Sequence, residues 1–292
     1  MRGVLAALAV GLAVAAASSA TASTRSLQHV TVIGDSVADA IPNYAPAVDV
    51  LGQGIDLDLE VSACRRVDDL SCPHDDGTRP PNVVELAKQM GPKLGPNVVV
   101  AVGYNDYEDH YAQNIENALA AFKAVGVKRV WWLTLRAAHH PYLNMNDDIV
   151  AAAVGHPELT VVDWNVYSRS HPDWFQSDGL HLLGAGAVGM ATLIHQRLLQ
   201  DGVAAKPVQM VTRTLPVAHP GRAYRARLAA RSGDAPYRWS LLARAPKGLH
   251  LEADGRIIGK PLVKAGTYPL NVRVKDAAGS FDTRRLVLRV AT

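Results

Sequence analysis

The chain has 292 residues, of which 48% are hydrophobic and 20% charged, so its composition excludes a disordered chain and its length suits two domains. The net charge of +3 conceals a split, because residues 207–292 carry 16 Lys and Arg against 5 Asp and Glu, whereas residues 1–206 carry 14 against 22. The basic part favours an anionic partner surface, and a solvated basic face without a partner is an equal alternative.

The N-terminus is typical of a secretory signal peptide over residues 1–22. Arg2 precedes the apolar run Val4–Ala17, and Ala20-Thr21-Ala22 forms a small-residue cleavage pattern. The run is short for a membrane span, so we expect no transmembrane segment in the mature chain, although a retained anchor is the alternative. We therefore expect a secreted or envelope-associated bacterial protein. Export argues against nucleic acid as its partner.

Predicted strands and helices alternate between residues 27 and 202. The run Asn97–Val102 is continuously apolar, as buried parallel strands are. The predicted strands are 29–33, 57–61, 97–102, 128–135 and 159–162, and the predicted helices are 82–90, 115–125, 147–154 and 185–199. Such alternation predicts an α/β domain, a parallel sheet with helices on both faces.

The loop over residues 65–81 is charged and rich in proline, and it lies beside the chain's two cysteines, Cys64 and Cys72. Because an exported protein meets an oxidising environment, we expect a disulfide between them, with free buried thiols as the alternative. His74 is near, but the spacing is not a zinc pattern, and we expect no metal.

The pattern changes after residue 202. Residues 203–216 hold two prolines and little periodicity, which indicates a linker. Residues 217–292 then contain alternating strands at 237–242, 268–274 and 285–290, separated by turn signals such as Asp254-Gly255. This pattern predicts a small all-β sandwich.

Three short motifs carry candidate catalytic residues: Gly34-Asp35-Ser36, Gly103-Tyr104-Asn105-Asp106 and Asp178-Gly179-Leu180-His181. The first two directly follow predicted strands, at the sheet edge where open α/β sheets bind ligands. A serine nucleophile needs a base such as His181, and that base needs a carboxylate such as Asp178. The N–H of Ser36 and the side-chain amide of Asn105 could donate hydrogen bonds to an oxyanion.

Each motif also has a structural interpretation. Ser36 and Asp35 could cap a helix, Asn105 could belong to a turn, and His181 could be a surface histidine. The predicted serine chemistry would be absent only if all three structural interpretations were correct.

These motifs resemble the sequence blocks of the SGNH/GDSL hydrolase family over residues 29 to about 200. The resemblance implies a flavodoxin-like three-layer α/β/α fold, with Ser36 as nucleophile, Asn105 as oxyanion donor, and Asp178 with His181 as the supporting pair. The family's second block supplies a glycine N–H to the oxyanion hole. This chain has no glycine at Val61–Arg66, and we take Cys64 as the equivalent residue.

The C-terminal part resembles Ig-like or cadherin-like domains of bacterial surface proteins. Tyr237–Ser240, Asp254–Pro261 and Val272–Asp276 carry this resemblance, as strand and turn residues that imply a fold and no site.

Two further patterns are discounted. Gly184-Ala-Gly-Ala-Val-Gly189 fits a dinucleotide fingerprint, but no strand precedes it, and we expect no cofactor. His139-His140 and Asp147-Asp148 lack further ligands at metal spacing.

The sequence therefore predicts a secreted serine esterase that removes short acyl groups from a cell-envelope glycan or lipid. The run Trp174–Leu182 supports the envelope, because it is similar to SGNH domains of bacterial envelope proteins, some attached to membrane acyltransferases. One alternative is a non-catalytic envelope- or carbohydrate-binding protein. Another is an O-acyltransferase with the same serine chemistry.

Overall fold

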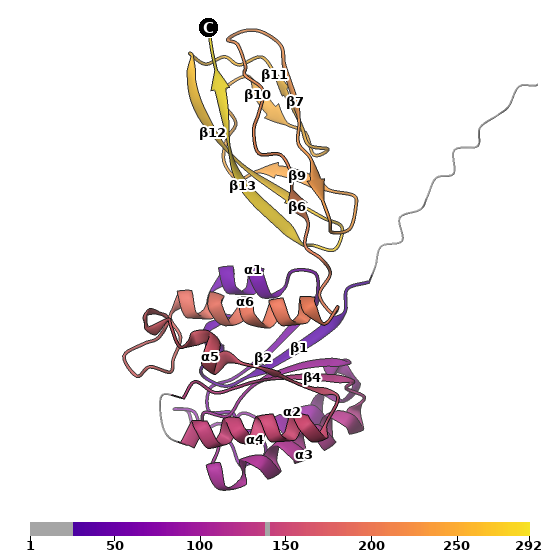
Figure 1. Cartoon of the computed structure of the whole chain (residues 1–292), viewed down its shortest axis with the longest axis vertical. Helices are drawn as coiled ribbons and strands as arrows, with labels where there is room; N and C mark the ends of the chain where they lie inside the picture. The colour runs from indigo at the N-terminus through magenta and orange to yellow at the C-terminus, as the bar shows by residue number, and fades with distance from the viewer. Residues whose placement is uncertain (1–25, 138–140) are drawn as a thin grey trace, which may run out of the picture.

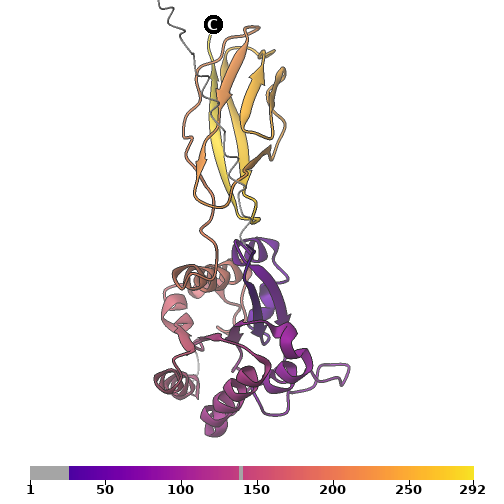
Figure 2. The same cartoon turned by 90° about the vertical axis from the view of Figure 1, so that its right-hand side faces the viewer.

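The computed structural model describes residues 26–137 and 141–292, which form an α/β domain followed by a β-domain (Figures 1 and 2). The predicted signal peptide and the pair His139-His140 lie outside these described residues. Within the described part of the chain, no helix is both long and apolar enough to cross a bilayer.

The central sheet has five parallel strands in the order β2-β1-β3-β4-β5. They are β1 (His29–Gly34), β2 (Asp56–Val61), β3 (Asn97–Ala101), β4 (Arg129–Leu133) and β5 (Leu159–Val162). This is the flavodoxin-like strand order, in which the chain reverses direction across the sheet between β1 and β3. The predicted α/β fold class is confirmed, and the switch point lies where Gly34 pairs with Ala101.

Helices cover both faces of this sheet (Figure 1). One face carries α1 (Ala45–Leu51), α5 (Trp164–Ser168) and α6 (Gly184–Gln200), and the other carries α2 (Val83–Met90), α3 (Tyr111–Val125) and α4 (Pro141–Gly155). Short 3-10 helices are η1 (Ala38–Ala40), η2 (Gly91–Leu94), η3 (Glu108–His110) and η4 (Pro172–Trp174). Because strand side chains alternate between faces, Trp131 packs in the α1/α6 core and its neighbour Trp132 in the α2/α3 core.

Helix boundaries follow local chemistry. Asn82 accepts the N–H of Glu85 at 2.8 Å, and the Glu85 carboxylate accepts the N–H of Asn82 at 3.1 Å, so a capping box begins α2. Gly126 ends α3 in the left-handed conformation, with φ of 98°. Helix α4 begins at Pro141, six residues before the predicted start at 147, and proline suits the first position of a helix because its missing N–H needs no partner there.

The β-domain has two main sheets, ordered β10-β11-β7 and β13-β12-β9, with a small third ladder β6-β8. The strands are β6 (Gln209–Met210), β7 (Tyr224–Arg227), β8 (Ala230–Arg231), β9 (Arg238–Leu241), β10 (Leu249–Leu251), β11 (Arg256–Gly259), β12 (Gly266–Lys275) and β13 (Phe281–Val290). Their inner faces share one core that contains Trp239, Val272 and Leu288. The predicted Ig-like sandwich is confirmed.

The segment predicted as a linker, residues 203–216, contacts both domains. The N–H of Ala205 donates to the carbonyl of Gly54 in the α/β domain at 2.9 Å. Val208 and Met210 are buried in the core of the β-domain. The segment between these two sets of contacts is therefore short and consists of Lys206 and Pro207.

Candidate active site

Ser36 lies directly beyond the carboxyl end of β1, where the chain turns into η1. The turn is tight, because a Cβ on Gly34 would lie 2.6 Å from the Cβ of Ala38. Only glycine therefore fits at the end of the strand, and it lets the chain present the half-buried Ser36 at the edge of the sheet.

Ser36, His181 and Asp178 form a hydrogen-bonded chain, although 145 residues separate the first two. The Oγ of Ser36 lies 3.0 Å from Nε2 of His181, and Nδ1 of His181 lies 2.6 Å from Oδ2 of Asp178. The other Asp178 oxygen accepts the N–H groups of Leu180 and His181. The hydrogen bond from His181, followed by that from the Leu180 N–H, lowers the pKa of Asp178 to about 2.

The segment that carries His181 is held against α6 by Trp174. The N–H of Gln176 donates to the carbonyl of His181 at 2.8 Å, which closes the loop on itself. A Cβ on Gly186 would overlap the Trp174 carbonyl oxygen, and one on Gly189 would overlap its indole ring. Packing therefore accounts for two of the three glycines whose spacing fits a dinucleotide fingerprint.

Cys64 and Asn105 lie in the loops that follow β2 and β3. Cys64 is bonded to Cys72, so the predicted disulfide is present, and its φ of 65° is in the left-handed region that favours glycine. Cys64 thus adopts a backbone conformation that glycine adopts more readily than other residues. The side-chain amide of Asn105 donates to the carbonyl of Arg65 at 3.3 Å, and an amide of this kind has a second N–H.

Asp35 ties the nucleophile loop to the Asn105 loop. Its fully buried carboxylate accepts the N–H of Val37 at 3.0 Å and the N–H groups of Gly103 and Tyr104 at 3.1 Å each. Burial raises the pKa of Asp35 to about 6, and these three hydrogen bonds oppose the rise. The sequence suggested only a capping role for this residue, and its place inside the Gly-Asp-Ser motif was the available signal.

Asp106 makes the corresponding link to the disulfide loop. One of its oxygens accepts the N–H of Val67 at 2.9 Å, and the other is buried without a hydrogen-bond partner among the residues that the structure describes. Burial raises the pKa of Asp106 to about 7. Asp35 and Asp106 together hold the loops after β1, β2 and β3 in one arrangement.

The arrangement suits transfer of an acyl group through a serine nucleophile. The Ser36 hydroxyl is hydrogen-bonded to the His181 imidazole, which is hydrogen-bonded in turn to the Asp178 carboxylate. Potential donors to an oxyanion lie on the adjacent loops. Among residues 26–137 and 141–292, no cluster of three His, Cys, Asp or Glu side chains could hold a metal ion.

Comparisons with known proteins identify relatives of both parts. The family model "Putative Ig domain" matches residues 203–291. The chain is 25% identical over 156 residues to a "Putative peptidoglycan O-acetyltransferase" of Bacillus subtilis, a match that covers 53% of this chain and 24% of the relative. The chain therefore spans about a quarter of the length of this curated relative.

Two solved structures resemble the chain more loosely. The C-terminal catalytic domain of peptidoglycan O-acetyltransferase A of Streptococcus pneumoniae is 17% identical with a TM-score of 0.47, covering 62% of this chain and 97% of that one. A carbohydrate esterase family 3 protein of Talaromyces cellulolyticus is 16% identical with a TM-score of 0.47, covering 60% and 97%. The Bacillus subtilis relative and the family model agree with the two resemblances seen in the sequence, to SGNH domains of bacterial envelope proteins and to Ig-like domains.

Proposed function

We propose that the protein is a serine enzyme that transfers acyl groups from O-acyl esters, with Ser36 as nucleophile, His181 as base and Asp178 as its orienting carboxylate. The observation that carries the proposal is the hydrogen-bonded chain from the Ser36 hydroxyl through both imidazole nitrogens to Asp178. A serine hydroxyl is a weak nucleophile until a neighbouring base accepts its proton.

In the first half-reaction, Ser36 Oγ bonds to the acyl carbon of the ester while its proton passes to Nε2 of His181. The resulting imidazolium is stabilised by Asp178, whose low pKa keeps it ionised at neutral pH. The N–H groups of Ser36 and Cys64 and the Asn105 amide donate to the oxyanion. The carbon–oxygen bond to the alcohol then breaks, and the alcohol leaves with the proton from Nε2.

In the second half-reaction, an acceptor hydroxyl gives its proton to His181 and attacks the acyl-Ser36 ester, which regenerates the free serine. Water as acceptor makes the protein an esterase, and a sugar hydroxyl makes it an O-acyltransferase. The sequence favoured the esterase, and the name of the Bacillus subtilis relative is what supports the transferase.

We place the substrate, with short acyl groups, on a cell-envelope glycan or lipid and the protein outside the cytoplasm. Support comes from the peptidoglycan named for the relative and from the predicted signal peptide at residues 1–22. The basic charge of residues 207–292 supports attachment of the β-domain to an anionic envelope polymer. A protein that only binds such a polymer is the non-catalytic alternative.

Hydrolysis of p-nitrophenyl acetate tests the proposal. The Ser36→Ala variant should lose at least about 10³-fold in kcat, whereas the control Ser240→Ala, at an exposed serine of β9, should match the wild type. Equal rates for Ser36→Ala and wild type would favour the binding protein. Adding an N-acetylglucosamine oligosaccharide separates the two enzymes, because acetylated sugar forms only with a transferase.

A further inference from the structure

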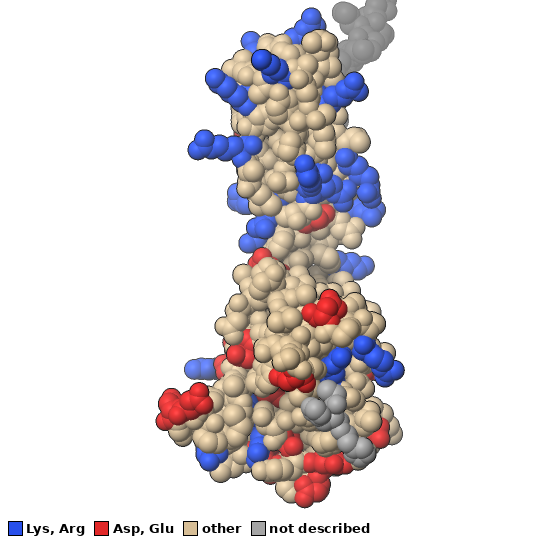
Figure 3. Space-filling model, turned by 90° about the vertical axis from the view of Figure 1, so that its left-hand side faces the viewer, with Lys and Arg blue, Asp and Glu red and all other residues tan. Residues whose placement is uncertain are grey.

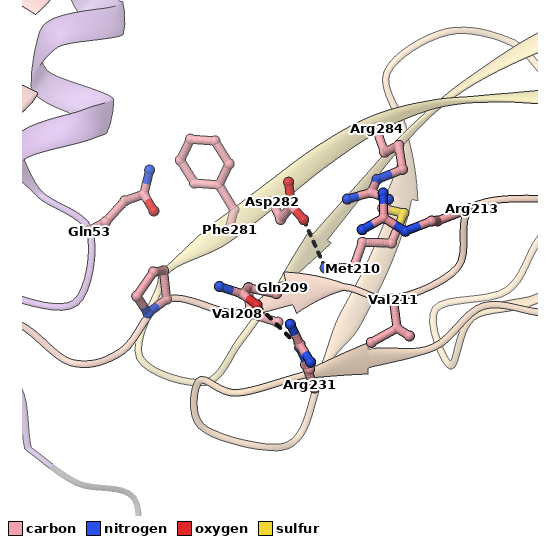
Figure 4. Close-up of a pocket in the computed structure, with 11 residues that line it drawn as sticks. Gln53, Val208, Gln209, Met210, Val211, Arg213, Arg231, Phe281, Asp282 and Arg284 are labelled. Carbon is pink, nitrogen blue, oxygen red and sulfur yellow. Dashed lines mark hydrogen bonds between the residues drawn. The ribbon is translucent and has the colours of Figure 1, made fainter.

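The β-domain has an open cavity on its side facing the α/β domain (Figure 4). Its volume is about 610 Å³, enough for a small ligand or a few units of a polymer. Figure 4 shows Arg213 and Arg284 toward one end, Arg231 near the middle beside Gln209, and Phe281 with Gln53 toward the other end. The lining residues are Gln53, Pro207, Val208, Gln209, Met210, Val211, Arg213, Arg231, Phe281, Asp282 and Arg284.

The three arginines of this cavity come from different segments. Arg213 follows β6, Arg231 ends β8 and Arg284 lies in β13. Nε of Arg231 donates to the side-chain oxygen of Gln209 at 3.2 Å. The guanidinium groups of Arg213 and Arg284 make no ion pair or hydrogen bond within residues 26–137 and 141–292. Their guanidinium donors therefore remain available to a ligand.

The one carboxylate of the lining does not neutralise these arginines. An oxygen of Asp282 accepts the N–H of Met210 at 2.8 Å, and no arginine of the cavity forms an ion pair with Asp282. Arg273 adds positive charge nearby, with its guanidinium 4.6 Å from the centre of the Phe281 ring. Figure 3 shows that Lys and Arg dominate the β-domain in this view, while Asp and Glu concentrate on the α/β domain.

Clustered arginines suit one ligand chemistry. Guanidinium groups bind phosphate and carboxylate oxygens with paired, charge-assisted hydrogen bonds. Phe281 and Val211 supply apolar surface that could lie against a sugar or an aliphatic backbone. The lining therefore fits a polymer that carries regular oxyanions more closely than it fits a neutral glycan.

The cavity lies away from the catalytic edge. Gln53 precedes β2, so it lies at the amino end of the parallel strands, whereas Ser36 follows the carboxyl end of β1. A six-residue strand separates the two ends by about 20 Å. A ligand in this cavity therefore leaves the Ser36 hydroxyl free.

We propose that the cavity binds the phosphate or carboxylate groups of an anionic cell-envelope glycan polymer through Arg213, Arg231 and Arg284. It serves as an anchor that keeps the catalytic edge near polymer-borne esters. The binding step stands by itself, and only the anchoring role rests on the proposed enzyme activity.

The test is titration calorimetry of the full mature chain with two soluble probes, poly(glycerol phosphate) and polygalacturonate. The variant with Arg213, Arg231 and Arg284 replaced by Gln should bind about 10- to 100-fold more weakly, because charge-assisted contacts are lost. A charge-matched control replaces three arginines that do not line the cavity, Arg222, Arg244 and Arg289, and should change affinity less than about threefold, through long-range charge alone. The single variant Arg213→Gln, at an exposed side chain, repeats the test with minimal risk to folding.

The possible results distinguish phosphate from carboxylate as the bound group, and they distinguish ligand binding in the cavity from the proposed enzyme activity. Binding of one probe alone identifies phosphate or carboxylate as the recognised group. Equal loss in both triple variants, or no binding of either probe, would overturn the cavity assignment. Hydrolysis of p-nitrophenyl acetate should be unchanged in the cavity variant, while KM for wall-bound esters rises and kcat stays constant. Cavity-dependent binding by a wild type without esterase or transferase activity would reject the proposed function and leave the binding site standing.

Discussion

The Asp35→Asn variant probes the link that holds the nucleophile loop to the Asn105 loop. The carboxylate accepts three backbone N–H groups, from Val37, Gly103 and Tyr104. Asparagine has the same shape and no charge, but one of its terminal atoms donates hydrogen bonds. It can therefore satisfy the Gly103 and Tyr104 groups or the Val37 group, but not all three.

The magnitude follows from the pKa of Asp35, which burial raises from 3.8 to about 6. A raised folded-state pKa means that the protonated carboxyl stabilises the fold below pH 3.8, and this stabilisation is lost as the pH rises through about 6. The loss amounts to about 3 kcal/mol. The Asn variant has no such titration. The free energy of unfolding of Asp35→Asn minus that of the wild type should therefore increase by about 3 kcal/mol between pH 3.8 and about 6.

Urea unfolding between pH 4 and 7.5, followed by tryptophan fluorescence, measures this difference, with the exposed-carboxylate variant Asp49→Asn as control. At neutral pH, kcat for p-nitrophenyl acetate should fall about 10- to 100-fold in Asp35→Asn, because Ser36 and Asn105 lose their mutual placement. A difference in unfolding free energy that stays constant with pH, or an unchanged kcat, would refute the role given to this buried carboxylate.

Three further variants, one of them a double substitution, test neighbouring parts of the α/β domain. Asn105→Ala should lower kcat for p-nitrophenyl acetate about 10²- to 10³-fold with little change in KM, and an unaltered kcat would remove it from the oxyanion donors. Gly189→Ala should destabilise the fold by about 1–3 kcal/mol in thermal unfolding, because its Cβ would overlap an indole ring, whereas Gly155→Ala, where a Cβ meets open space, should not. Replacing both Cys64 and Cys72 by Ser should lower the free energy of unfolding in urea by about 2–3 kcal/mol. Equal stability of the wild type with and without reductant would contradict a stabilising disulfide.

The sheet, and the edge of it that holds Ser36 and Asn105, could be predicted because continuous apolar runs are typical of buried parallel strands. Asn97–Val102 is such a run, and the structure has β3 at Asn97–Ala101. The first and second motifs follow β1 and β3. Because the carboxyl ends of parallel strands lie at one edge of a sheet, this placement predicts that Ser36 and Asn105 lie at the same edge. Short elements were missed, such as α5 at Trp164–Ser168, because a five-residue helix carries too few apolar positions for a clear period.

The loop-to-loop bonds could not be predicted. Asp35 and Asp106 accept backbone N–H groups of residues far along the chain, and backbone donors carry no residue-type signal. The left-handed conformation of Cys64 is similarly invisible, because non-glycine residues seldom adopt it. The cavity of the β-domain joins Arg213, Arg231 and Arg284 through strand pairing that composition alone does not reveal.

Trapping of the covalent intermediate shows directly whether Ser36 is the nucleophile. The wild type is mixed with p-nitrophenyl acetate, quenched in acid within milliseconds and digested, and the acetylated peptide is identified by mass spectrometry. We expect a burst of about one equivalent of nitrophenol and acetylation of Ser36, with neither in His181→Ala. Acetylation of another residue, or turnover without any acetyl-Ser36, would contradict it.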